Sequence, residues 1–429
     1  MKKNKQTGKG KKTSPSGDVY EGDFVDGMYH GKGTLSLLCG DVYSGDFAMG
    51  KFHGKGTYTF PDGAMYEGDF AEDNFHGKGT FTYPNGEVYS GDYLDGLRDG
   101  KGIYTFPGGE VYEGDFVDGS YHGKGSMTFS DGAVYEGDFV DGIRHGKGVF
   151  TFPDGEVYEG DIADGDPTGK GTLTFPGGAV YSGDFLRGCP QGKGKLSIPD
   201  AEVYEGGFSD GKRHGRGKQT FANGETYCGD FAEGFRDGKG TYTLPSGEAY
   251  CGDFAEGSYQ GKGTLTFPDG AMYCGDFVDN MYHGKGKLAL PDGSVYEGGF
   301  SGGKRHGEGR QLFPGGSVYE GSFVNDKRYG KGKLSFPDGS AYEGDFVDGK
   351  TYGNVKETLP RSIREGGFDE GRHVKERSFP GSAACEDGFE GRCGKEKRAF
   401  ADGKAHEGGF GKDTYAGKGT YAFPDKECP

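Results

Sequence analysis

Histidine is the residue of this sequence with the clearest potential for chemistry, because imidazole binds metals and transfers protons near neutral pH. Eight of the ten histidines occupy one position of a 23-residue period, namely His30, His53, His76, His122, His145, His214, His283 and His306. Neighbouring units of a strand array are about 10 Å apart, whereas two ligands of one zinc ion lie within about 3 to 4 Å of each other. We therefore predict no shared metal ion, and we assign these histidines to a short connection beside a glycine turn.

Two further patterns resemble functional sites, and the repeat explains both of them better. Cys228, Cys251 and Cys274 occupy one position of three successive units. They are too far apart to form disulfides with one another, because bridged Cα atoms lie within about 7 Å. The recurring string Gly-Lys-Gly-Thr resembles a phosphate loop, but that loop needs Ser or Thr directly after Gly-Lys. We predict no catalytic residue, no metal site and no cofactor, and hence a protein that is not an enzyme.

Tyrosine marks the period along the regular part of the chain. It recurs every 23 residues from Tyr20 to Tyr342, which makes fifteen uninterrupted units. A period between about 20 and 50 residues is typical of a repeat array, in which each unit buries its apolar face against its neighbours. A representative unit, residues 41–63, reads DVYSGDFAMGKFHGKGTYTFPDG.

Each unit contains two segments in which a ring or glycine alternates with a polar residue, and this alternation is the pattern of β-strands. In the representative unit these segments are 42–47 and 54–60, joined by a connection over 48–53. The Pro-Asp-Gly sequence at 61–63 is expected to form the turn into the next unit.

Placing Asp46 opposite Lys55 sets the register of the predicted hairpin. The other pairs in this register are Tyr43 with Tyr58, Gly45 with Gly56, and Phe47 with Gly54. One face then carries rings packed over glycines, and a slip by one residue would turn every ring into water. In the first two units we expect this core to consist of Tyr20, Gly22, Phe24, Gly31, Gly33, Tyr43, Gly45, Phe47, Gly54, Gly56, Tyr58 and Phe60.

These patterns predict an all-β fold, an elongated and twisted single-sheet array of consecutive antiparallel hairpins. A single sheet must cover its apolar face by curling, by packing rings over glycines, or by pairing with a second copy. The third route predicts a homodimer. We divide the body of the chain into fifteen regular repeats at 18–362, two degenerate repeats at 363–404, and a terminal partial repeat at 405–429.

Charge separates the start of the chain from its body. The basic residues at the start are Lys2, Lys3, Lys5, Lys9, Lys11 and Lys12, whereas the whole chain has a formal net charge of −17. The acidic body argues against nucleic acid binding. We expect residues 1–17 to form a disordered basic arm that makes weak contact with anionic membranes. The chain has no apolar run long enough to span a bilayer, so we expect a cytoplasmic protein.

The unit's pattern YEGDF, HGKGT and FPDG closely resembles the MORN repeat over residues 18 to about 360. Members of that family usually have Trp where this chain has Phe24, Phe47 and their equivalents. The resemblance implies an extended all-β array used for scaffolding, dimerisation and attachment to membranes or cytoskeleton. We therefore expect a non-enzymatic scaffold for protein partners, with tethering to membrane or cytoskeleton as a further expectation. The alternative is a membrane-associated protein whose repeats bind phospholipids such as phosphoinositides.

Overall fold

The computed structural model describes residues 6–358, 398–399 and 405–406. Its described residues are all-β, and the strands from β1 to β31 form one open antiparallel sheet of consecutive hairpins. The predicted fold class is therefore confirmed. These residues fall into two compact units, which divide between Gln191 and Gly192.

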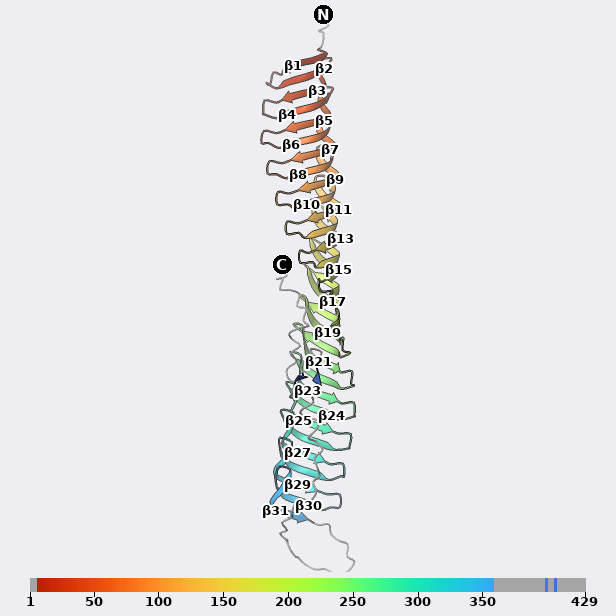
Figure 1. Cartoon of the computed structure of the whole chain (residues 1–429), viewed down its shortest axis with the longest axis vertical. Coiled ribbons are helices and arrows are strands. Elements are labelled where there is room, and N and C mark those ends of the chain that lie inside the picture. Colours follow the sequence, from red (N-terminus) through yellow and green to blue (C-terminus); the bar gives the residue numbers. More distant parts are fainter. Residues whose placement is uncertain (1–5, 359–397, 400–404, 407–429) are drawn as a thin grey trace, which may run out of the picture. The chain divides into compact units, whose positions relative to one another are not determined.

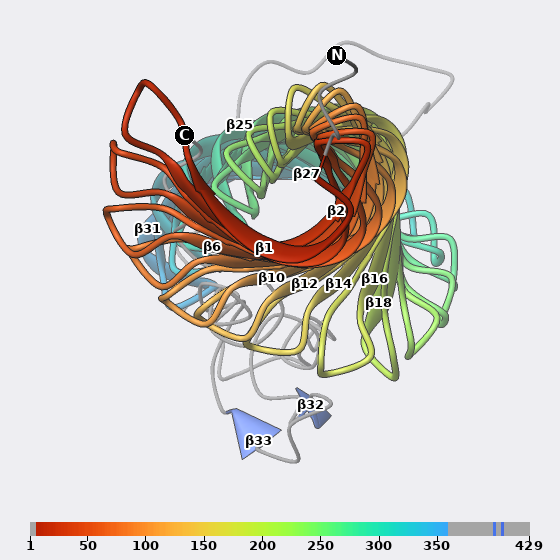
Figure 2. The same ribbon diagram turned by 90° about the horizontal axis from the view of Figure 1, so that it is seen from above.

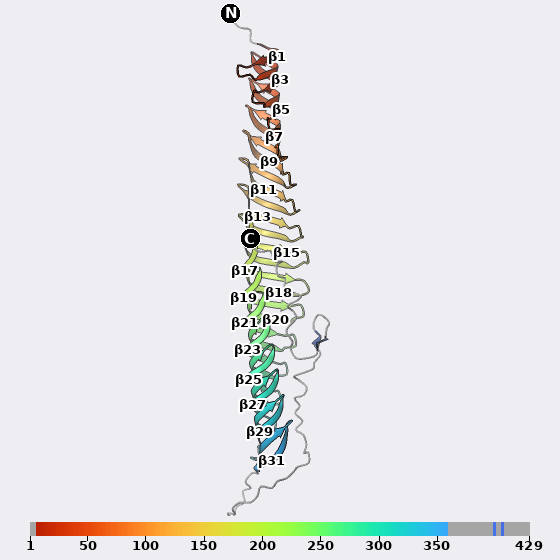
Figure 3. The same cartoon turned by 90° about the vertical axis from the view of Figure 1, so that its left-hand side faces the viewer.

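In the first unit each strand pairs antiparallel with the next one along the chain, and Figures 1 and 3 show this succession. Seen from above, the strands at the start of this unit follow an arc instead of running straight (Figure 2). The strands are β1 Gly8–Thr13, β2 Val19–Val25, β3 Met28–Ser36, β4 Val42–Ala48, β5 Lys51–Thr59, β6 Met65–Ala71, β7 Asn74–Thr82, β8 Val88–Leu94, β9 Leu97–Thr105, β10 Val111–Val117, β11 Ser120–Thr128, β12 Val134–Val140, β13 Ile143–Thr151, β14 Val157–Ala163, β15 Asp166–Thr174 and β16 Val180–Leu186.

The second unit repeats the same arrangement, and β17 contains the boundary. Its strands are β17 Cys189–Ile198, β18 Glu202–Ser209, β19 Lys212–Phe221, β20 Thr226–Ala232, β21 Phe235–Thr243, β22 Ala249–Ala255, β23 Ser258–Thr266, β24 Met272–Val278, β25 Met281–Ala289, β26 Val295–Ser301, β27 Lys304–Leu312, β28 Val318–Val324, β29 Lys327–Ser335, β30 Ala341–Val347 and β31 Lys350–Thr358. A separate two-stranded pair consists of β32 Arg398–Ala399 and β33 Ala405–His406.

The connection inside each hairpin is shorter than the sequence predicts. Between β4 and β5 only Met49 and Gly50 lie outside the strands, and their φ angles are 52° and 88°. Two successive positive φ angles define the type I′ turn, whose twist matches that of the flanking strands. The predicted connection over 48–53 is therefore wrong, and His53 belongs to β5.

The predicted register is right for the first half of the hairpin and wrong for the second. Tyr43 lies opposite Tyr58, as predicted. Gly45 likewise lies opposite Gly56, but the next two pairs are Asp46 with His53 and Phe47 with Phe52. The physical reason is a β-bulge, in which Gly54 and Lys55 are extra residues on β5 and Gly54 has a φ of 61°.

The bulge changes which aspartate lies opposite Lys55. On its other side β5 pairs with β6 without a bulge, and Lys55 lies opposite Asp69 of the next repeat. The two side chains form an ion pair with a distance of 2.8 Å between Nζ and Oδ1. The recurring Asp–Lys pair therefore joins successive repeats, and it does not close the individual hairpin.

The turn between repeats agrees with the sequence. The amide of Gly63 donates a hydrogen bond to the carbonyl of Phe60 at 3.1 Å, and the amide of Phe60 donates to the carbonyl of Ala64 at 2.9 Å. Gly63 has a φ of 91°, a conformation that favours glycine. Residues 61–63 therefore form the predicted turn.

The prediction of a disordered arm at 1–17 is wrong for part of that segment. Gly8–Thr13 form β1, which pairs with β2 and places Lys9 opposite Asp23 and Lys11 opposite Glu21. The reason is that GKGKKT has the alternation of the GKGTYT segment of β5. Lys2, Lys3 and Lys5 lie outside the described residues, as do most of the predicted degenerate and partial repeats over 363–429.

The core of the first unit is a continuous layer of rings on one face of the sheet. Tyr43 is 1% exposed, stacks on Phe52 at a centroid distance of 4.0 Å, and meets Phe70 of the next repeat edge to face at 4.8 Å. Such pairs add about 0.5 to 1.5 kcal/mol each beyond area burial. One chain buries these rings by itself, so no second copy is needed to cover them. The homodimer therefore stays a prediction.

Candidate functional site

The predicted core residues divide into three structural groups, namely glycines beneath a tyrosine ring, aromatic rings, and bulge glycines. Gly45 and Gly56 lie beneath the ring of Tyr43, where a Cβ built on Gly56 would lie 2.5 Å from Tyr43 Cε2. Gly22 and Gly33 have the same place beneath Tyr20. Tyr20, Phe24, Tyr43 and Phe47 are buried, and Tyr58 and Phe60 are half-buried. Gly31 and Gly54 are the bulge glycines, with φ angles of 59° and 61°.

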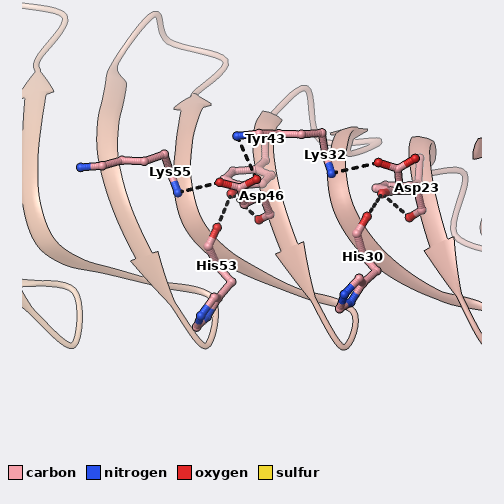
Figure 4. A network of polar contacts seen from close by, with 8 residues as sticks. Asp23, His30, Lys32, Tyr43, Asp46, His53 and Lys55 are labelled. Carbon is pink, nitrogen blue, oxygen red and sulfur yellow. Dashed lines mark hydrogen bonds and ion pairs between the residues drawn. The ribbon is translucent and has the colours of Figure 1, made fainter.

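Most repeats carry a polar network around one aspartate, drawn for Asp46 in Figure 4. Its Oδ1 forms an ion pair with Nζ of Lys32 in the preceding repeat at 2.8 Å. Its Oδ2 accepts a hydrogen bond from the amide of Lys55 at 3.1 Å. Its backbone carbonyl accepts a hydrogen bond from the hydroxyl of Tyr43 at 2.7 Å. Burial raises the pKa of Tyr43, so the phenol remains a protonated donor. One residue thus holds the bulge, the ring and the neighbouring hairpin together.

This arrangement recurs as a ladder along both units. In the first unit the ion pairs are Lys32–Asp46, Lys55–Asp69, Lys78–Asp92, Lys101–Asp115, Lys124–Asp138, Lys147–Asp161 and Lys170–Asp184. In the second unit Lys239–Asp253 and Lys262–Asp276 continue the pattern. Gly207, Gly299 and Ser322 take the place of the aspartate in three repeats, so the carboxylate contacts of the network are lost there. The tyrosine contact remains, because the hydroxyl of Tyr204 still donates to the carbonyl of Gly207 at 2.9 Å.

The ladder predicts a loss of stability in acid. The hydrogen bond from Lys124 lowers the pKa of Asp138, and the hydrogen bond from Lys147 lowers the pKa of Asp161. A carboxyl with a lowered folded pKa contributes stability above its unfolded pKa of about 3.9, and this contribution is lost as the pH falls through the folded pKa. We expect the melting temperature measured by circular dichroism to hold from about pH 7 to 5 and to fall steadily below about pH 4.

The matched control for this prediction is the double variant Asp138→Asn, Asp161→Asn. It has two fewer titrating carboxyl groups in the ladder, so its melting temperature should fall less than that of the unmodified chain between about pH 5 and 3. Equal losses in the two proteins would show that the ladder does not cause the acid sensitivity.

A long groove follows the polar face of the first unit, opposite the rings. It has a volume of about 2110 Å³ and is lined by residues of β1 to β12, from Lys9 to Gly137. One row of its lining residues is the lysines of the ladder, and a second row consists of glutamates and serines, such as Glu67 and Ser90. Glycine pairs such as Gly45 and Gly56 expose their backbone between the rows. The groove therefore offers a repeated set of charged, hydroxyl and peptide groups.

The eight repeat histidines lie in hairpin strands, and the three repeat cysteines are exposed. Figure 4 shows the rings of His30 and His53 pointing away from the aspartate network, to which they contribute backbone carbonyls. Cys228, Cys251 and Cys274 are exposed free thiols. The described part of the chain contains no group of three or more His, Cys, Asp or Glu side chains able to hold a metal ion. Residues 6–358 contain no helix of the length and apolar character needed to cross a bilayer.

Sequence reasoning missed the arginines that take the place of a core ring. The position held by Tyr29 and Phe52 is arginine in six repeats, namely Arg98, Arg144, Arg213, Arg236, Arg305 and Arg328. The guanidinium of Arg98 lies 5.0 Å from the ring centroid of Tyr104 and 5.7 Å from that of Tyr89. Such cation–π contacts replace a ring–ring stack. The sequence contained a signal for this packing, because one repeat position is aromatic in some units and arginine in others.

Two solved structures of TCP domains are distantly similar to this chain. The TCP domain of Drosophila melanogaster SAS-4, solved with a proline-rich motif of Ana2, is 15% identical with a TM-score of 0.26, and the match covers 41% of this chain and 90% of that one. The TCP10 domain of Danio rerio CPAP is 15% identical with a TM-score of 0.23, covering 57% and 99%. At such low TM-scores these similarities support no functional assignment.

Comparison at the level of sequence is decisive for the family. A search of curated proteins gave no match. The MORN repeat model, in contrast, matches consecutive segments over 43–201 and 204–341, and it also matches 1–19, 20–37 and 406–427. These segments cover well over half of the chain and share the 23-residue period of the hairpins. The chain therefore belongs to the MORN repeat family.

Proposed function

We propose that this protein is a non-enzymatic scaffold that binds protein partners along the polar groove of the first unit. The observation that carries this proposal is the continuity of the groove, which presents equivalent groups from β1 to β12. A partner lying along it meets lysine and glycine groups at equivalent places in successive repeats, so many weak contacts add up. Membership of a repeat family and an extended lined surface both support binding rather than catalysis.

The charge of the groove favours protein over phosphate-bearing ligands. The lysines at the centre of the groove, such as Lys55 and Lys78, are held by aspartates at 2.8 and 2.7 Å. Surface pairs of this kind stabilise little, but they leave no net row of cations for phosphates. The glutamates and hydroxyls beside them suit a partner that carries both charges and peptide groups. We propose that such partners tether the protein to membrane or cytoskeleton in the cytoplasm.

A photo-crosslinking experiment tests the groove. A photoactivatable amino acid placed at Thr57 or Thr80, both in the groove lining, should give discrete protein adducts in cells. The matched control carries the same amino acid at Asp62, an exposed turn residue outside the lining, and should give few adducts. Adducts of equal yield at all three positions, or none at the two groove positions, would reject the groove as the binding surface.

Phospholipid binding is the competing proposal, and β1 is the part of the structure that favours it. Lys9, Lys11 and Lys12 lie close together on this strand, although Lys11 forms an ion pair with Glu21 at 3.3 Å. Deleting the start of the chain would remove β1 and expose the edge of β2, so substitution is the cleaner comparison. Flotation with vesicles containing phosphatidylserine and a phosphoinositide, using the unmodified chain and a Lys9→Gln, Lys11→Gln, Lys12→Gln variant, separates lipid binding by this strand from binding by the repeats.

A further inference from the structure

A second surface of the first unit is formed by apolar side chains at the tips of three consecutive hairpins. Leu94 is 49% exposed, Leu97 50%, Val117 44%, Val140 44% and Ile143 52%. We call these five residues the tip stripe. They lie at the ends of β8, β9, β10, β12 and β13, outside the lining of the groove.

Hairpin geometry brings these side chains together. Leu94 lies opposite Leu97 across its turn, and Val140 lies opposite Ile143 across another. Hydrogen bonds link successive tips, because the amide of Gly119 donates to the carbonyl of Arg98 at 2.9 Å. The tip stripe therefore lies on three hairpin tips that are direct neighbours along the sheet, and in the middle tip Val117 lies opposite Ser120.

The tip stripe has definite ends. In the preceding hairpin the equivalent pair is Ala71 and Asn74, and in the following one it is Ala163 and Asp166. Single exposed apolar residues are ordinary on protein surfaces, whereas a contiguous set indicates an interaction site. Three adjacent tips with large aliphatic residues form such a set.

Acidic residues flank the tip stripe. Each of its turns begins with an exposed aspartate, and these are Asp95, Asp118 and Asp141. Among ion pairs between described residues, the only one that involves these three joins His122 to Asp141 at 3.9 Å, and it requires a protonated histidine. The aspartates therefore give the apolar surface a negative border.

We propose that the tip stripe binds an amphipathic helix of a partner protein, with an apolar seam every seven residues and lysine or arginine beside it. Two strands per repeat place successive tips roughly 9.6 Å apart, and seven helical residues rise about 10.5 Å. A helix laid across the tips can thus place apolar side chains on the outer pairs and on Val117 of the middle tip. This inference depends on the proposed role as a protein-binding scaffold and identifies the chemistry of one partner.

Three other occupants fit the tip stripe less well. An added β-strand needs unpaired backbone, but the tips are turns whose amides are bonded to the previous hairpin. An anionic membrane would be repelled by the bordering aspartates. A second copy laid on the same surface would bring like-charged turns together.

The test uses a defined probe, a fluorescent 21-residue helical peptide with two leucines per heptad and lysines beside them. Anisotropy with the full chain should show saturable binding that weakens with added salt. A Leu94→Gln, Leu97→Gln, Ile143→Gln variant should bind at least tenfold more weakly. The matched control, Val25→Gln with Met28→Gln, changes the tip between β2 and β3 and should leave the affinity unchanged.

Several outcomes would overturn the inference. Equal affinity of the tip variant and the unmodified chain would do so, as would equal binding of a peptide with glutamate in place of lysine or with scrambled leucines. Binding to anionic vesicles that is lost in the tip variant would assign the surface to lipid. Groove cross-links without peptide binding reject this inference alone, and peptide binding without groove cross-links rejects the groove alone.

Discussion

Substituting Gly56 by alanine is expected to destabilise the first unit by about 3 kcal/mol, because overpacking a tight core costs this much when neighbours cannot move. A Cβ at Gly56 would lie 2.5 Å from Cε2 of Tyr43 and 2.6 Å from its hydroxyl. The ring cannot retreat, since it is stacked on Phe52 and its hydroxyl donates to the carbonyl of Asp46. Hydrogen exchange of the β4 and β5 amides, together with urea unfolding, measures the effect.

Gly315→Ala is the matched control for Gly56→Ala. A Cβ at Gly315 would meet no atom within 4 Å, so its substitution should change stability by less than about 0.5 kcal/mol. Equal protection of β4 and β5 in the Gly56→Ala variant and the unmodified chain would show that the ring-over-glycine contact is not a constraint on the fold.

The second large effect is expected at a buried ion pair of the second unit. Arg213 is 7% exposed and Glu202 is 6% exposed, and the two side chains are paired while Gln219 also donates to Glu202. Arg213→Ala leaves a buried carboxylate without its cation, a change that typically costs about 3 to 5 kcal/mol. We expect this loss in urea unfolding, with increased hydrogen exchange in β18 and β19.

A paired apolar replacement separates the buried charge from the loss of packing. Glu202→Leu with Arg213→Met keeps similar volume and removes both charges, so it should be more stable than Arg213→Ala. The buried amide of Gln219 loses its acceptor in this variant, which accounts for a remaining loss of about 1 to 3 kcal/mol. If the double variant is as unstable as Arg213→Ala, packing of the guanidinium against Tyr204, whose centroid is 5.2 Å away, accounts for the loss.

The sequence predicts the strands and the packing of rings over glycines, because alternation and a strict period constrain both. It predicts the partner of Lys55 wrongly for a clear reason. In a periodic chain, Asp46 and Asp69 are equivalent candidates, nine and fourteen residues away, and a repeat pattern alone does not separate them. Only the bulge at Gly54 decides between them, because it places Asp46 opposite His53 and not opposite Lys55.

A local signal for the correct register was nevertheless present at the tips. Asp-Gly, as at Asp95-Gly96, is a typical two-residue hairpin turn, and it fixes Leu94 opposite Leu97. Counting back from that turn requires the extra residues that form the bulge. The groove and the tip stripe could not be predicted, because they depend on which exposed side chains meet across neighbouring hairpins.

The bond between Lys55 and Asp69 makes the junctions of the array interchangeable. If residues 66–88 were excised, Met65 would be followed by Tyr89, and Lys55 would find Asp92 in the place of Asp69. Unequal recombination between copies of the coding segment that keep both the lysine and the aspartate would therefore yield another chain with matched junctions. Selection can lengthen or shorten such a protein in whole steps, and the number of copies becomes an inherited trait that varies independently of the fold.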